Sequence, residues 1–107
     1  MGMELTIAFR TSSPAWPAVR DRLAQRGLSF QILMIDGELA FPDEHPPDPW
    51  HELRLKTPHG MITARREPHR IVLVTWGNAD PALLEQRNVL AQVFAECGDG
   101  FVEDAAS

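Results

Sequence analysis

The stretch that decides the fold is residues 70–98, RIVLVTWGNADPALLEQRNVLAQVFAECG. Its opening RIVLVTW is rich in β-branched and apolar side chains, which is typical of a buried strand. Asp80 and Pro81 then favour a helix start, because Asp accepts a free backbone N–H and Pro lacks one. Apolar residues recur beyond them at helical spacing, and Gly98 is expected to end the helix. This predicted apolar stripe comprises Leu83, Leu84, Leu90, Ala91, Phe94 and Cys97.

Two further strands are predicted immediately upstream, at 50–56 and 61–67, and tight turns at 57–60 and 67–69 connect the three. If the turns are centred there, Leu53 lies opposite Ala64, Ala64 lies opposite Leu73, and Arg66 faces Ile71. Side chains alternate between the two faces of a sheet. One face therefore becomes an apolar core made of Leu53, Leu55, Ile62, Ala64, Ile71 and Leu73.

The N-terminal part predicts a strand, a helix and a hairpin. Residues 4–10 alternate apolar and polar side chains after Glu4, as a half-buried strand does. Ser13 and Pro14 favour a helix start, and Gly27 favours its end. Strands at 29–35 and 38–41 follow, joined by a type I′ turn at Asp36-Gly37. The helix would bury the apolar residues Trp16, Val19 and Leu23.

These elements predict a single α+β domain over residues 1–107. It is an antiparallel sheet of five to seven strands with two helices packed on one face, in the order β-α-β-β-β-β-β-α. Residues 42–49 contain four prolines and are expected to form a surface loop, because proline cannot donate to a helix or sheet. Phe101 and Val102 dock as a short last strand or simply pack, and 103–107 reads as a flexible tail.

Composition narrows the classes of function. The chain has 107 residues, a net charge of −5 and one cysteine. The acidic balance argues against a nucleic-acid partner, which calls for a basic face. A single cysteine excludes an intrachain disulfide, and no apolar run reaches the roughly 20 residues of a membrane span. We therefore expect a cytoplasmic protein without a membrane or nucleic-acid partner.

Histidines are the first candidates for chemistry. His45, His51 and His69 fall near acidic residues at one end of the predicted strands, where they could bind a metal ion. His59 lies in the turn at the other end, roughly 17–20 Å away. None of the four stands in a recognised metal-binding spacing. Histidines that are merely solvated in surface turns explain the pattern equally simply.

Other candidate sites have structural explanations. The loop 76–81 precedes a helix, where anions bind, but it has one glycine and Asp80 would occupy the helix N-terminus. Cys97 near a helix end is best explained as a small core residue. The serines lie in no nucleophile motif. We therefore assign no catalytic residue and expect no cofactor, and the sequence leans against an enzyme.

The second face of the predicted sheet is the strongest functional candidate. It carries apolar side chains beside arginines, a composition typical of protein interfaces. A monomer seldom exposes a large apolar patch. Either self-association or a protein partner covers this face, or the hairpin or Pro-rich loop does. We expect a non-enzymatic module that self-associates, the alternative being a small ligand- or metal-binding domain or enzyme beside the Pro-rich loop. The interface candidates are Met61, Val72, Val74, Trp76, Arg54 and Arg65.

Overall fold

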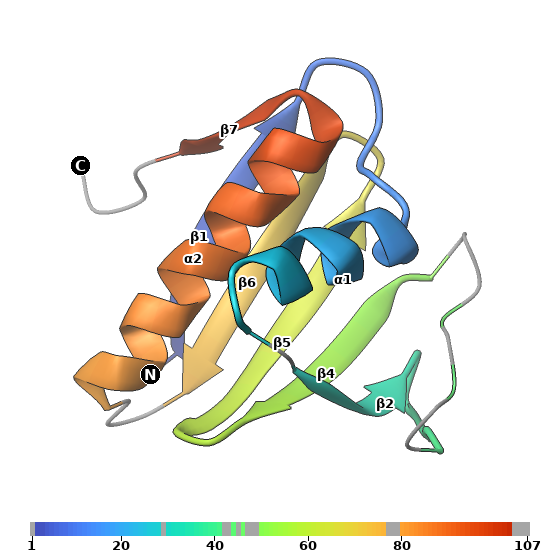
Figure 1. The fold of residues 1–107 in the computed structure, drawn as a ribbon. Coiled ribbons are helices and arrows are strands. Elements are labelled where there is room, and N and C mark those ends of the chain that lie inside the picture. Colours follow the sequence, from blue (N-terminus) through green and yellow to red (C-terminus); the bar gives the residue numbers. More distant parts are fainter. Residues whose placement is uncertain are drawn as a thin grey trace.

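The computed structural model describes residues 2–28, 30–41, 44, 46, 50–76 and 80–103. Over these residues it is an α+β fold with a seven-stranded antiparallel sheet and two helices, which confirms the predicted class (Figure 1). In chain order the elements are β1 (Gly2–Phe9), α1 (Trp16–Gln25), β2 (Gln31–Ile35), β3 (Glu38–Leu39), β4 (Glu52–Thr57), β5 (Gly60–Glu67), β6 (Arg70–Trp76), α2 (Pro81–Gly98) and β7 (Gly100–Glu103).

The strands lie in the order β3-β2-β4-β5-β6-β1-β7. The register of the meander is the predicted one, with Leu53 opposite Ala64 and Ala64 opposite Leu73. The N-terminal strand β1 pairs antiparallel with β6 and places Leu5 opposite Leu73. The last strand, β7, pairs with the outer edge of β1 and includes Glu103, which was expected to belong to the flexible tail, and the rest of that expected tail, 104–107, lies outside the described residues.

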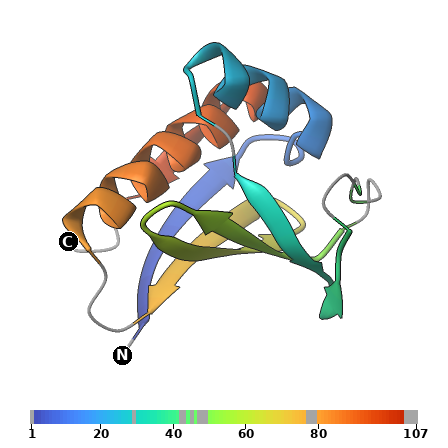
Figure 2. The same cartoon turned by 60° about the horizontal axis from the view of Figure 1, so that its bottom comes forward.

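Both helices lie on the same side of the sheet, as the two ribbon views show (Figures 1 and 2). The core forms between this side and the helices, and the rings of Trp16 and Phe94 join the two helices at a centroid distance of 6.3 Å. All six residues predicted for the core face of the sheet are buried, and each has a relative exposure of 0%. They are Leu53, Leu55, Ile62, Ala64, Ile71 and Leu73.

The N-terminus of α2 is capped as predicted. Asp80 Oδ1 accepts a hydrogen bond from the Ala82 backbone N–H at 2.8 Å. The helix ends differently, because Gly98 is still helical and Asp99 takes the left-handed conformation with φ 54°. A Cβ at Gly98 would lie 2.7 Å from the Phe9 ring. Gly98 is therefore needed for close packing on β1, whereas the sequence suggested a helix stop.

The helix α1 begins at Trp16, two residues after the predicted first position. Ala15 is its N-cap and makes no side-chain hydrogen bond. Ser13 does not cap the helix, because its Oγ accepts a hydrogen bond from Arg66 Nε at 2.6 Å. The predicted apolar stripe is buried, and Gly27 with φ 77° follows the helix end as expected.

The hairpin turn at Asp36-Gly37 is confirmed, with φ values of 51° and 85°. Its strands are shorter than predicted, because β2 begins at Gln31 and β3 ends at Leu39. The β2 strand pairs with β4 and thereby extends the same sheet. The hairpin therefore does not fold over the second face, which was one of the two structural explanations offered for that face.

Candidate functional site

The face of the sheet turned away from both helices, called the open face below, carries the predicted interface residues. Trp76 and Met61 are its most exposed apolar side chains in the central strands, with relative exposures of 59% and 46%. Val72 is half-buried, and Arg54 and Arg65 are exposed. No described helix or strand is packed over this face (Figure 2).

Val74 is the exception among the predicted interface residues. It is only 1% exposed, yet it does not belong to the core cluster on the helix side. Its cross-strand neighbours are Glu4 on β1 and Thr63 on β5, and Thr63 is itself 5% exposed. Val74 is therefore the covered centre of the open face, and a partner would contact the side chains that surround it.

The register arranges the open face in rows that run across the strands. One row contains Glu4, Val74, Thr63 and Arg54, with the acid on β1 and the arginine on β4. Continuing the β5–β6 register by two residues sets Met61 opposite Trp76 in the next row. In the Val74 row the two central residues, Val74 and Thr63, are uncharged and lie between Glu4 and Arg54, and Met34 on β2 continues the row beyond Arg54.

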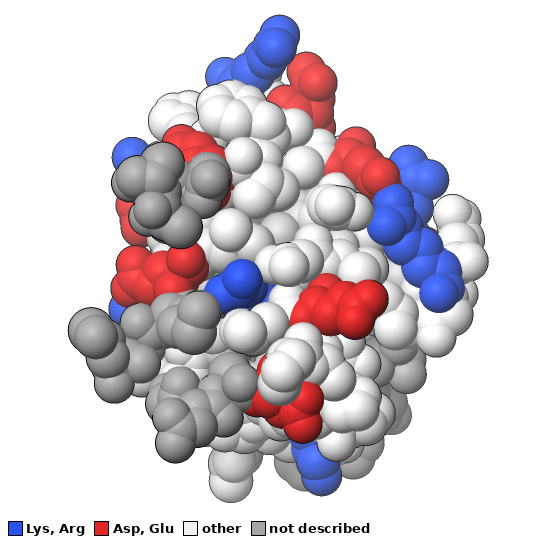
Figure 3. All heavy atoms as spheres, turned by 90° about the vertical axis from the view of Figure 1, so that its left-hand side faces the viewer, with Lys and Arg blue, Asp and Glu red and all other residues white. Residues whose placement is uncertain are grey.

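The charges of the open face balance, although the whole chain carries −5. Arg65 Nε lies 3.5 Å from Glu52 Oε2, and two other bases of this face, Arg54 and Lys56, form no ion pair with the described residues. Figure 3 views the molecule from the left-hand side of Figure 1 and shows acidic and basic residues interspersed on that side. By strand alternation, the acids are Glu4, Glu52, Glu67 and Glu103, and the bases are Arg54, Lys56, Arg65 and Arg70.

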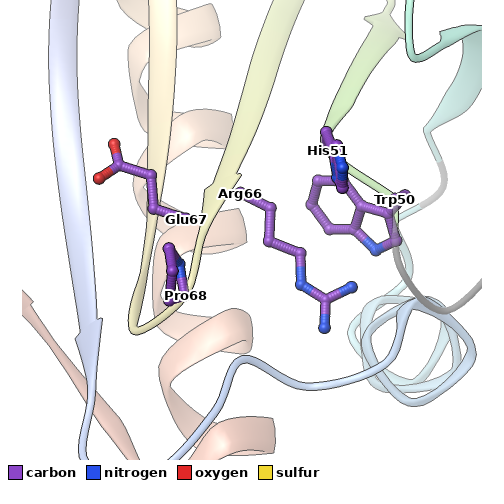
Figure 4. Close-up of a pocket in the computed structure, with 5 residues that line it drawn as sticks. All are labelled: Trp50, His51, Arg66, Glu67 and Pro68. Atoms are coloured by element: carbon purple, nitrogen blue, oxygen red, sulfur yellow. The ribbon is translucent and has the colours of Figure 1, made fainter.

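A shallow groove of about 260 Å³ lies at the end of β4 and β5. Its wall is the Trp50 indole, above which the Arg66 guanidinium carbon lies 5.4 Å from the ring centroid (Figure 4). Trp50 is 1% exposed, and its Nε1 has no acceptor among the described residues. The sequence predicts a strand start at Trp50 but gives no signal of this stacking, because its partner Arg66 belongs to the next strand. The groove is lined by Trp50, His51, Arg66, Glu67 and Pro68.

Two of the three predicted metal-binding histidines, His51 and His69, are among the described residues. His51 and His69 are both exposed, and His69 Nδ1 lies 2.5 Å from the Thr11 carbonyl oxygen. His45 lies outside the described residues. Among those described, no group of three His, Cys, Asp or Glu side chains is placed to hold a metal ion. The observed contact of His69 is that of a histidine satisfied by a loop backbone.

Asp36 is the best-defined acidic group near His51. Its Oδ1 accepts backbone N–H groups of His51 at 2.7 Å and of Glu52 at 2.8 Å. Burial acts to raise the pKa of Asp36, but the two N–H donors and the nearby His51 outweigh it, so the pKa lies below its ordinary value. The carboxylate therefore holds the hairpin to β4 and serves structure.

The remaining candidates also have structural roles or fall outside the described residues. Cys97 is half-buried, and its Sγ lies 3.6 Å from the Ala18 carbonyl oxygen, between the two helices. In the loop predicted at 76–81, residues 77–79 are outside the described part, and Asp80 is engaged by its own helix. No helix in the described ranges combines the length and apolarity needed to cross a membrane.

No protein-family model, curated protein or solved structure matches this chain. A fold of this class supports many unrelated activities. The open face and the groove beside Trp50 are therefore the features whose chemistry bears on function.

Proposed function

We propose that this chain is a non-enzymatic interaction module that forms a homodimer through the open face. The observation that carries the proposal is the exposed pair Trp76 and Met61, which lies in the row next to the buried Val74. Trp and Met are enriched where proteins bind one another, and central aromatic residues supply much of the binding energy. Association would remove this apolar surface from water.

The balanced charge of the open face favours a second copy of the chain. Two copies that each carry −5 repel one another overall, but a neutral face with both signs is complementary to itself. A nucleic acid would instead need a surplus of bases on the face. The groove beside Trp50 supports a ligand-binding function less well, because Arg66 already bonds Ser13 and stacks on Trp50.

The size of the open face sets the strength to expect. The strands β4, β5, β6, β1 and β7 are about 4.8 Å apart and about 20 Å long, which gives roughly 500 Å² in projection. Side-chain relief raises the accessible area towards the roughly 800 Å² per partner of a standard interface. We therefore expect a dimer that dissociates on dilution, at the small end of specific interfaces.

The experiment is analytical ultracentrifugation of the wild type, Trp76→Glu and Phe41→Glu over a wide concentration range. Phe41 is the matched control, because it is an aromatic residue with 74% exposure outside the strands. The wild type and Phe41→Glu should be dimers that dissociate on dilution. Trp76→Glu should weaken the dimer at least about 30-fold, the effect of losing a central aromatic.

Tryptophan fluorescence gives a second measurement on the unmodified protein. Trp16 and Trp50 are 3% and 1% exposed, so Trp76 is the residue whose emission responds to the solvent at the open face. Dilution should dissociate the dimer and shift the emission to longer wavelength, because Trp76 becomes exposed to water. A wild type that is monomeric at every concentration, or a dimer unaffected by Trp76→Glu, would end the proposal.

A further inference from the structure

The lateral order of charges on the open face determines how two copies would be arranged. A dimer of two identical faces has a two-fold axis in the plane between them. Sheets pack with their strands aligned to within about 30°. The axis therefore runs either along the strands or across them. The two choices bring different residues face to face, and the Val74 row distinguishes them.

We infer that the two-fold axis runs along the strands, above the line between β5 and β6. This inference rests on the proposed self-association. In the Val74 row, Glu4 on β1 and Arg54 on β4 are placed symmetrically about the line between β6 and β5, each one strand further out. Rotation about an axis along the strands above this line brings β1 over the partner's β4, so Glu4 faces the partner's Arg54. Both residues are exposed and form no ion pair with the described residues of their own chain.

The same axis brings complementary apolar groups together at the centre. Because β5 and β6 lie on either side of it, Trp76 faces the partner's Met61, and each dimer contains this contact twice. A thioether beside an aromatic ring is a favourable contact. In the next row Val74 lies across from the partner's Thr63, and because both are uncharged and nearly fully buried, no charge is placed at the centre of this row.

An axis across the strands through the Val74 row gives a poorer arrangement. It places Glu4 on the partner's Glu4 and Arg54 on the partner's Arg54, and facing like charges disfavour a complex. Packed sheets lie about 10 Å apart. Extended Glu and Arg side chains from opposite sheets together span this distance, so the pairing of Glu4 with Arg54 needs no change in the backbone.

The test is a charge exchange measured by sedimentation at about 0.15 M salt, where long-range attraction is screened. The variants are Glu4→Arg, Arg54→Glu and the combined E4R/R54E. Each single reversal creates two like-charge contacts per dimer and should weaken dimerisation about tenfold or more. The combined variant restores opposite charges at both contacts, so its Kd should return towards that of the wild type. Circular dichroism checks that every variant is folded.

Mixing the two single variants, Glu4→Arg and Arg54→Glu, is a further experiment. The heterodimer should be stronger than either homodimer, because both of its contacts between positions 4 and 54 join opposite charges. Glu85→Arg on α2 and Arg20→Glu on α1 change the net charge equally but lie on the helices, which cover the other side of the sheet. They should leave the dimer within about twofold of the wild type. If the combined variant is no stronger than the single ones, the axis is wrong even though the dimer is real. A monomeric wild type would instead refute the proposed function itself.

Discussion

Leu73→Ala tests the assignment of the two sheet faces. Leu73 is 0% exposed and lies between Ala64 on β5 and Leu5 on β1. The truncation removes three carbons, which costs about 2.4 kcal/mol at about 0.8 kcal/mol each. Ala64 has only a methyl group and cannot fill the space. A remaining void of about 60 Å³ adds roughly 1.4 kcal/mol. We therefore expect a loss of about 3–4 kcal/mol in the free energy of unfolding.

The assay is urea unfolding followed by circular dichroism, in a Trp76→Glu background so that dimerisation does not add to the apparent stability. With a slope of about 1–3 kcal/mol per molar urea, the midpoint should fall by about 1–4 M. Leu39→Ala is the control, because Leu39 is 82% exposed and its truncation should change stability by less than about 0.5 kcal/mol. An unchanged midpoint for Leu73→Ala would refute the assignment of this residue to the core.

Two local predictions concern Asp36 and Asp80. The pKa of Asp36 is lowered in the folded protein, so its carboxylate stabilises the fold above the unfolded pKa near 3.8 and loses this effect as pH falls through the folded value. At pH 7, Asp36→Asn should thus have a lower melting temperature than the wild type, and its free energy of unfolding should be smaller by less than about 1 kcal/mol because the site is exposed. If the difference in melting temperature between the two proteins is just as large at a pH below the folded pKa of Asp36, this mechanism is contradicted. Asp80→Ala leaves the Ala82 N–H without its acceptor and should cost about 1 kcal/mol in urea unfolding; an unchanged midpoint would show that the cap contributes nothing.

The candidate site was predictable in part. Strand alternation alone placed Trp76, Met61, Arg54 and Arg65 on one face, and the structure has them there. The burial of Val74 was not predictable, because it depends on its neighbours from β1 and β5. The position of β1 between β6 and β7 pairs the first strand with two strands from the second half of the chain, and no short-range pattern specifies such a pairing.

Ser13 and Trp50 illustrate the same limit. Ser13 has the chemistry of a helix cap, but its oxygen bonds Arg66, which is far away in the sequence. The stacking of Arg66 on Trp50 likewise needs two strands to be in place first. The metal site was predicted from composition and stays a prediction, because His45 lies outside the described residues and His51 and His69 belong to no three-residue group of possible ligands among those described.

The sequence by itself determined the local elements and the register of the meander. The Asp36-Gly37 turn, the Asp80-Pro81 helix start and the alternation along β4, β5 and β6 each depend on residues close to one another in the chain. Only the tertiary structure decided which face of the sheet is covered and which residues share the open face. Both helices cover one side of the sheet, and β1 brings Glu4 into the same row as Arg54, three strands away. Burial and pairing across the sheet are contacts between distant segments, which exist only after the chain has closed on itself.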